Sequence, residues 1–304
     1  MSQQTLSKNA IETKGLGKRY RSFWALKDCS INIPKGSVSA LVGPNGAGKT
    51  TLLKLLVSLS SPSEGSASVL SKPPSQKPEY ISEIGYLAQE IPMYSRLNAK
   101  EHITMGQHLN DSWDSDLATQ RLNELSIPLD RPIGKLSGGQ RAQVALGLAL
   151  AKKPKLLLLD EPVAALDPLA RVDFLKSLAR AVTDADGELT VVMSSHLLAD
   201  LERVCDHIVI LASGETQLCD DIENVLISHK LLVGKRQDTA NDEYTIIQQT
   251  DTPKETSLLV RLNNAKFHNS RWHIRDVDME EIVLAYMGQS REKIDIKATK
   301  GVKL

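Results

Sequence analysis

The stretch that decides the fold of this chain is Gly43-Pro44-Asn45-Gly46-Ala47-Gly48-Lys49-Thr50-Thr51. It matches the phosphate-loop pattern G-x-x-x-x-G-K-[ST] at every position. Residues 38–42 before it are apolar enough for a short buried strand, and the leucines within residues 52–59 after it indicate a helix with one apolar face. A strand, a glycine-rich loop and a helix in this order are the context that the pattern requires, so a chance glycine-rich turn is a poor alternative.

The chemistry of this loop predicts a site for a nucleoside phosphate. Glycines let backbone N–H groups turn inward toward phosphate oxygens, and the helix that starts near Lys49 directs its positive end at the same anion. Lys49 adds a mobile positive charge for the β and γ phosphates, and the Thr50 hydroxyl is placed to ligate Mg²⁺.

Composition narrows the class of protein around this loop. The chain has 304 residues, enough for two unequal domains, and its formal charge of +0 gives no general attraction to nucleic acid or anionic lipid. Its three cysteines show no C-x-x-C spacing, as is typical of a reduced cytosolic protein. We expect no membrane-spanning segment and no secretory signal, because the apolar runs are too short and residues 1–9 are polar.

Two acidic residues follow the most apolar strand of the chain. Residues 156–159 are all leucine, and Asp160 and Glu161 come directly after them. The carboxyl end of a parallel strand is where α/β proteins bind ligands, so a solvated acidic turn is a weak alternative. Asp160 can reach Mg²⁺ through water, and Glu161 is a candidate general base for a water molecule.

His196 follows the next expected strand, residues 188–193. A single histidine at a strand end is more often structural than catalytic. Because this strand end shares a sheet edge with the phosphate loop and Glu161, the position favours a functional role.

A second candidate anion site lies at Leu136-Ser137-Gly138-Gly139-Gln140. Ser137 is a suitable N-cap for a helix that runs to Lys152, and two glycines at a helix start expose backbone N–H groups. A plain helix cap is an equally good explanation of these residues taken alone.

Tyr20 precedes the loop in sequence, with Phe23 and Trp24 close by. An aromatic ring here could stack on a purine. For Phe23 and Trp24, packing on a small sheet is an equally good interpretation.

The remaining sequence divides into recognisable regions. Residues 10–33 have strand patterns, and residues 91–136 indicate a helical subdomain inserted into an α/β core. From residue 215 short strand patterns alternate with polar turns, and residues 278–287 predict a closing helix. The tail from Gln289 onward is polar, which predicts mobility.

The order of these motifs resembles the ATP-binding subunit of ABC transporters over about residues 11–214. The resemblance implies an α/β fold of the P-loop NTPase type, with an antiparallel β subdomain and an inserted helical subdomain. It implies an ATP-binding domain at 10–214, with the helical subdomain at about 90–140. The region 215–288 is similar to the small α+β C-terminal extension of exporter-type subunits whose permease is a separate chain, with a mobile tail at 289–304.

The resemblance also implies roles for individual residues. Tyr20 is similar to the aromatic residue that stacks on adenine. The loop from Gly43 to Thr51 is similar to the residues that hold ATP. Glu161 and His196 resemble the catalytic carboxylate and the residue that senses the γ-phosphate. The metal-site positions implied by the family are Thr50, Gln89 and Asp160. Segment 137–140 would act on nucleotide held by a second chain, and Asp167 would couple the two sites.

These roles imply ATP and Mg²⁺ as cofactors and an ATP hydrolase as the enzyme. The expected partners are an integral membrane permease and a second ATPase, either an identical chain or a paralogue, with no nucleic acid. The expected location is the cytoplasmic face of the cell membrane, as a peripheral subunit that drives export. The alternative is a soluble ABC ATPase that acts on ribosomes or DNA. A small-molecule kinase is disfavoured because Glu161 and the segment 137–140 would have no role.

Overall fold

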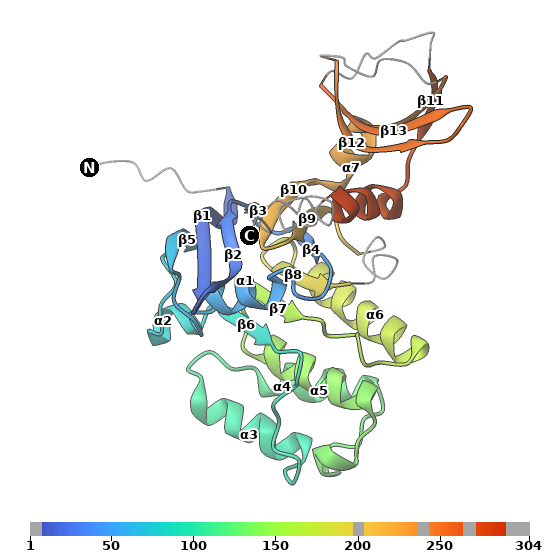
Figure 1. The fold of residues 1–304 in the computed structure, drawn as a ribbon. Coiled ribbons are helices and arrows are strands. Elements are labelled where there is room, and N and C mark those ends of the chain that lie inside the picture. The colour runs from blue at the N-terminus through green and yellow to red at the C-terminus, as the bar shows by residue number, and fades with distance from the viewer. Residues whose placement is uncertain (1–7, 197–203, 236–242, 264–271, 290–304) are drawn as a thin grey trace.

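The computed structural model describes residues 8–196, 204–235, 243–263 and 272–289 (Figure 1). Most of the expected C-terminal tail, 290–304, lies outside the described residues, as do residues 1–7. Within the described ranges no helix is both long and apolar enough to cross a bilayer.

A six-stranded sheet forms the centre of the molecule, in the order β10-β9-β4-β8-β7-β6. Its strands are β4 (Val38–Val42), β6 (Ile84–Leu87), β7 (Leu156–Asp160), β8 (Thr190–Ser195), β9 (His207–Ala212) and β10 (Glu215–Asp221). Neighbouring strands from β9 to β6 are parallel, and β10 is antiparallel to β9. Every residue of β4, β7, β8 and β9 is buried, which explains their near-continuous apolar sequences.

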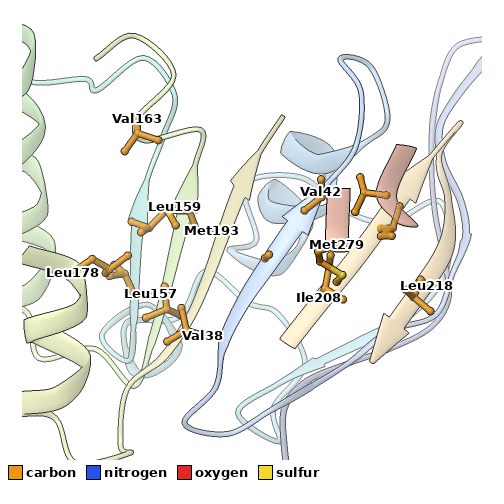
Figure 2. Close-up of a cluster of buried hydrophobic side chains, with 14 of the residues drawn as sticks. Val38, Val42, Leu157, Leu159, Val163, Leu178, Met193, Ile208, Leu218 and Met279 are labelled. Carbon is orange, nitrogen blue, oxygen red and sulfur yellow. The ribbon is translucent and has the colours of Figure 1, made fainter. Parts of the chain in front are cut away.

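Helices cover both faces of this sheet. Helix α1 (Lys49–Leu56) packs its leucines on one face, together with Leu41, Leu158 and Val209. Helices α5 (Gly138–Ala151) and α6 (Pro168–Asp184) cover the other face, in the cluster that contains Val38, Leu157 and Leu159 (Figure 2). The α/β fold expected from the sequence is confirmed.

A separate antiparallel sheet precedes and flanks α1. It consists of β1 (Asn9–Tyr20), β2 (Phe23–Cys29), β3 (Asn32–Pro34) and β5 (Glu64–Val69), and the short helix α2 (Pro78–Ile81) follows it. This sheet packs on the α1 side of the six-stranded sheet, through residues such as Ile11, Leu16 and Leu26. It is the antiparallel subdomain that the family resemblance implied.

The inserted region is helical. It contains α3 (Ala99–Leu109), α4 (Ser115–Glu124), the 3₁₀ helix η1 (Ile133–Lys135) and the start of α5. These elements enclose a hydrophobic cluster of their own, which includes Ile103, Leu122 and Val144.

The C-terminal region begins later than the sequence indicated. Because β10 pairs with β9, residues 215–221 belong to the six-stranded sheet, and a boundary at 214 would divide a β-hairpin. Helix α7 (Ile222–Ser228) follows. A second sheet then forms in the order β12-β13-β11-β14. Its strands are β11 (His229–Gly234), β12 (Tyr244–Asp251), β13 (Thr256–Leu262) and β14 (His273–Asp276).

The last described helix, residues 279–289, follows β14 and packs in one buried cluster with residues of both sheets. Met279, Ile282 and Val283 belong to the same buried cluster as Val42 and Ile208. Figure 2 shows Met279 close to Ile208 and Val42. The C-terminal region therefore shares a hydrophobic core with the strand that leads into the phosphate loop.

Candidate nucleotide-binding site

Lys49 lies buried at the centre of the phosphate loop, where α1 begins. Its Nζ donates hydrogen bonds to the carbonyl oxygens of Gly43 (2.7 Å) and Pro44 (3.3 Å). The same Nζ lies 3.2 Å from Glu161 Oε1, so the lysine and this carboxylate form an ion pair. The positive charge is thus held directly over the loop.

Two glycines of the loop are required by close backbone approaches. A Cβ on Gly43 would lie 2.3 Å from the carbonyl oxygen of Leu211. A Cβ on Gly48 would lie 2.6 Å from the carbonyl oxygen of Ala25, and the φ of Gly48 is +104°. These contacts fix the loop against β9 and β2, which keeps its shape ready for a ligand.

Asp160 is a buried carboxylate with neutral hydroxyl partners. Thr50 Oγ1 donates to its Oδ1 over 3.1 Å, and Ser194 Oγ donates to the same oxygen over 2.9 Å. The residue is 1% exposed. A buried negative charge is costly without a cation, so this arrangement fits a bound positive ion. The charge of Asp160 also reaches Tyr86, whose pKa is raised to about 12, mainly by burial and further by this carboxylate.

The oxygen atoms near the phosphate loop suit Mg²⁺, which takes few protein ligands, better than a metal whose ligands all come from protein. A hydroxyl from Thr50, the Asp160 carboxylate and the Gln89 amide oxygen are all hard oxygen ligands. The described part of the chain contains no group of three His, Cys, Asp or Glu residues arranged to hold a metal. Mg²⁺ commonly takes one or two protein carboxylates and completes its coordination with water and phosphate oxygens.

Glu161 contacts both Lys49 and His196, which were predicted from the sequence to lie at the same sheet edge. Its Oε1 contacts Lys49, and its Oε2 lies 2.9 Å from Nδ1 of His196. The Glu161 side chain is 9% exposed, whereas that of His196 is 40% exposed. The carboxylate is therefore shielded but lies next to a histidine that reaches solvent.

These residues surround one cavity of about 530 Å³, within the size range of small-molecule sites. Gln89, Glu161 and His196 line it together with the phosphate loop. The cavity is lined by Phe23, Ala25, Asn45, Gly46, Ala47, Gly48, Lys49, Thr50, Thr51, Gln89, Glu161, Ala164 and His196.

The aromatic residue in the lining is Phe23, and Tyr20 is not part of it. Tyr20 is the cross-strand partner of Phe23 in the β1–β2 pair, and Lys18 Nζ lies 5.2 Å from the centroid of its ring. Adenine stacking by Tyr20 stays a prediction. Ala164 also lines the cavity, and Ser194 contacts Asp160 and Glu161 from outside the lining. No motif in the sequence gave either residue a role.

The signature segment, residues 137–140, lies outside this lining. Ser137 Oγ accepts a hydrogen bond from the Gln140 N–H, and Gln140 Oε1 accepts one from the Ser137 N–H, both at 3.1 Å. This is a capping box at the start of α5. A Cβ on Gly139 would lie 2.7 Å from Ala170 Cβ, so the glycine lets α6 approach closely.

Asp167 caps the neighbouring helix. Its Oδ1 accepts hydrogen bonds from the N–H groups of Leu169 (3.1 Å) and Ala170 (3.0 Å) at the start of α6. The Gly139 contact therefore brings two capped helix N-termini together.

A second cavity, of about 450 Å³, lies next to the first. It is lined by residues that include Gln89, Met93, Gly138, Arg141 and Glu161. Gln89 and Glu161 line both cavities, and Gly138 at the start of α5 lines the second. The start of α5 therefore lies next to the nucleotide site.

Fold and site together define an α/β ATPase of the phosphate-loop type. The family model described as ABC transporter matches residues 26–164. The chain is 36% identical to the uncharacterized ABC transporter ATP-binding protein YxlF of Bacillus subtilis, over 67% of this chain and 68% of that protein. It is 33% identical to the sulfate/thiosulfate import ATP-binding protein CysA of Synechococcus elongatus, over 68% of this chain and 61% of CysA. The chain thus spans less than two thirds of CysA.

The structure is also similar to solved ABC proteins. The dimeric structure of MJ0796, a bacterial ABC transporter cassette, superposes with a TM-score of 0.61 at 25% identity. It covers 69% of this chain and 98% of that cassette. The chain belongs to the ABC transporter ATP-binding proteins, whose activity is ATP hydrolysis.

Proposed function

We propose that this chain binds Mg²⁺-ATP in the cavity at the sheet edge and that its hydrolysis energises a separate integral membrane permease. The observation that carries the proposal is that Lys49, Glu161 and His196 line one cavity and contact one another, while Asp160 is hydrogen-bonded to Thr50 of the same lining. A nucleoside triphosphate fits because the loop supplies a cation and N–H groups, and Glu161 supplies a carboxylate beside them.

In this proposal Lys49 exchanges its carbonyl and carboxylate partners for phosphate oxygens. Mg²⁺ would be held by Thr50, Asp160 and Gln89, and it would neutralise phosphate charge. Glu161, released from Lys49, then accepts the proton of the attacking water. His196, whose Nδ1 meets Glu161 Oε2, orients this carboxylate.

We further propose that two chains, identical or paralogous, pack head to tail and share two sites. The signature segment lies outside the cavity lining of its own chain, and its glycines and helix start offer N–H groups to an anion. The dimeric structure of MJ0796 supports such an assembly. Asp167, which caps the helix next to Gly139, would then lie near the nucleotide of the partner.

A mixture of two inactive variants should test this arrangement. In a Ser137→Arg chain the phosphate loop is intact, and in a Lys49→Ala chain the signature segment is intact. A mixed dimer therefore contains one complete site, so hydrolysis should return to at most about a quarter of the parent rate in an equal mixture. Phosphate release is measured for each variant alone and for the mixture. No recovery, despite mixed dimers shown by differential tagging, would mean that residues 137–140 act only as a helix cap.

The permease contact is proposed to lie in the segment after Gln89. Tyr94 is 64% exposed, whereas Met93 packs partly against the buried clusters beneath it. The backbone N–H of Tyr94 donates to Nε2 of His102 over 3.2 Å, which fixes this loop on α3. An ordered loop with an exposed ring beside a cavity-lining glutamine suits a docking surface.

Tyr94→Asp should weaken assembly with the permease, because docking would bury a charge against an apolar surface. ATP affinity of the isolated subunit should stay within two-fold, since Tyr94 does not line the nucleotide cavity. Leu109→Asp, which adds the same charge at an exposed apolar position at the end of α3, should assemble normally. Co-purification with the permease and nucleotide titration are run on all three proteins. Intact assembly with lost ATP binding would place this loop in the nucleotide site instead.

The direction of transport is a separate matter. CysA, the relative above whose name states a direction, is an import protein, so the comparisons give no support to the expectation of export. We therefore propose the coupling to a permease without a direction. The ribosome- or DNA-directed alternative is not favoured by the relatives. A peripheral position on the cytoplasmic face of the membrane follows from the proposed role.

A further inference from the structure

Ser194 is a buried serine that contacts both acidic residues of the site. It lies on β8 and is 0% exposed. The parallel register of β7 and β8 pairs Asp160 with Ser194, which brings together two residues that are 34 positions apart in sequence. The contact therefore depends on the strand register of the sheet.

The directions of the two hydrogen bonds of Ser194 are fixed by their partners. The backbone N–H of Glu161 can only donate, so Ser194 Oγ accepts this bond at 2.9 Å. The Asp160 carboxylate can only accept, so the Ser194 O–H donates to its Oδ1 at 2.9 Å. One hydroxyl thus connects the backbone of the proposed base to the side chain of the proposed metal ligand.

The backbone at Glu161 needs such a support. Its φ is +48°, in the left-handed region that a residue with a Cβ adopts at a cost in free energy. Unusual backbone conformations persist where surrounding contacts determine them, and buried N–H groups require a partner. Ser194 provides that partner, and Asp160 in turn fixes the rotation of the hydroxyl.

We propose that Ser194 is a positioning residue for ATP hydrolysis, an inference that rests on the function proposed above. By holding Asp160 Oδ1 together with Thr50, it sets the orientation of the carboxylate toward the metal position. By accepting from the Glu161 N–H, it sets the backbone from which the proposed base extends toward Lys49 and His196. Ser194 itself does not line the nucleotide cavity.

The neighbouring strand supplies a matched control. Ser39 on β4 is also 0% exposed, and its hydroxyl lies 3.1 Å from the hydroxyl of Ser37. Ser39→Ala thus removes a buried hydroxyl from the same sheet without touching either acidic residue. Ser194→Thr keeps the hydroxyl at the position in question, and Ser194→Ala removes it.

Steady-state ATP hydrolysis of the full chain is measured against ATP and against Mg²⁺, and ATP binding is measured without metal. Ser194→Ala should lower kcat by about 10- to 100-fold and raise the Mg²⁺ concentration for half-maximal activity several-fold, as loss of supporting partners does at metal sites. Metal-free ATP affinity should stay within two-fold. Ser194→Thr should recover most of kcat, and Ser39→Ala should match the parent.

A readout independent of activity is the hydrogen exchange of the peptide that contains Glu161. Exchange should be faster in Ser194→Ala than in the parent and Ser39→Ala, because the Glu161 N–H loses its acceptor. If Ser194→Ala does not fold, Ser194→Cys takes its place, since a thiol is a weak donor and acceptor of similar shape. The same decrease in kcat and the same faster exchange are then expected.

Parent-like kcat and Mg²⁺ dependence in Ser194→Ala would overturn the proposal, as would an equal loss in Ser39→Ala. A fall in metal-free ATP affinity as large as the fall in kcat would also overturn it. These results can be distinguished from those expected if the proposed ATPase function itself were wrong. In that case the parent itself would not hydrolyse ATP, or Glu161→Gln would hydrolyse it at the parent rate.

Discussion

Glu161→Gln should bind ATP but hydrolyse it about 10²- to 10⁴-fold more slowly than the parent, because the amide cannot accept the proton of the attacking water. The substitution keeps the size of the side chain, and the amide can still form a hydrogen bond with His196. It removes the ion pair with Lys49, which leaves that cation available to phosphate. Phosphate release under saturating ATP measures the loss, and nucleotide titration measures retained binding.

The same variant should make the dimer observable. If ATP closes two chains on each other and hydrolysis separates them, blocked hydrolysis should hold them together. Size-exclusion chromatography with ATP should then give a dimer for Glu161→Gln and mainly a monomer for the parent. Glu188→Gln, which neutralises an exposed carboxylate just before β8, should behave like the parent. A monomeric Glu161→Gln chain with ATP bound would reject the head-to-tail dimer.

Lys49→Ala should weaken ATP binding by about 10- to 150-fold, since a hydrogen bond to a charged group contributes about 1.5–3 kcal/mol. The parent lysine lies buried against the loop carbonyls. Titration with a fluorescent ATP analogue measures the two dissociation constants. Lys54→Ala, which removes an exposed lysine from the last turn of the same helix, should bind like the parent.

Thermal unfolding of Lys49→Ala is measured beside the titration. The substitution leaves the shielded Glu161 carboxylate without its cation, and His196 remains as its other partner. A lower melting temperature is therefore expected. Equal ATP affinity in the parent and in a folded Lys49→Ala chain would contradict the assignment of the phosphate loop to the nucleotide site.

The sequence predicted the central sheet and much of the site because the relevant signals are local. Residues 156–159 are four leucines followed by two acids, so a buried strand and its polar end were readable together. The phosphate loop fixed the direction of the chain at the same edge. His196 was expected at the same sheet edge as Glu161, and its Nδ1 lies 2.9 Å from the Glu161 carboxylate. Parallel strands bring their carboxyl ends to one edge, which turns local patterns into a shared site.

Features that depend on contacts between strands could not be predicted in this way. The role of Ser194 requires the β7–β8 register, and nothing in its own sequence surroundings indicates a carboxylate partner. The presence of Phe23 in the cavity, and of Tyr20 outside it, follows from the β1–β2 pairing, which includes shifts in register. The end of the six-stranded sheet at Asp221 follows from the β9–β10 hairpin, which a change in composition near residue 214 does not reveal.

The shared core of the C-terminal helix and β4 has a consequence for how the chain can vary. Val42, which directly precedes the phosphate loop, belongs to the same buried cluster as Met279 and Ile282. A change of side-chain volume at Met279 or Ile282 is therefore a change in the support of β4, although it lies more than 200 positions away in sequence. In homologous chains whose helix differs at these buried positions, we expect matching differences in the residues of β4 and β9 that contact it.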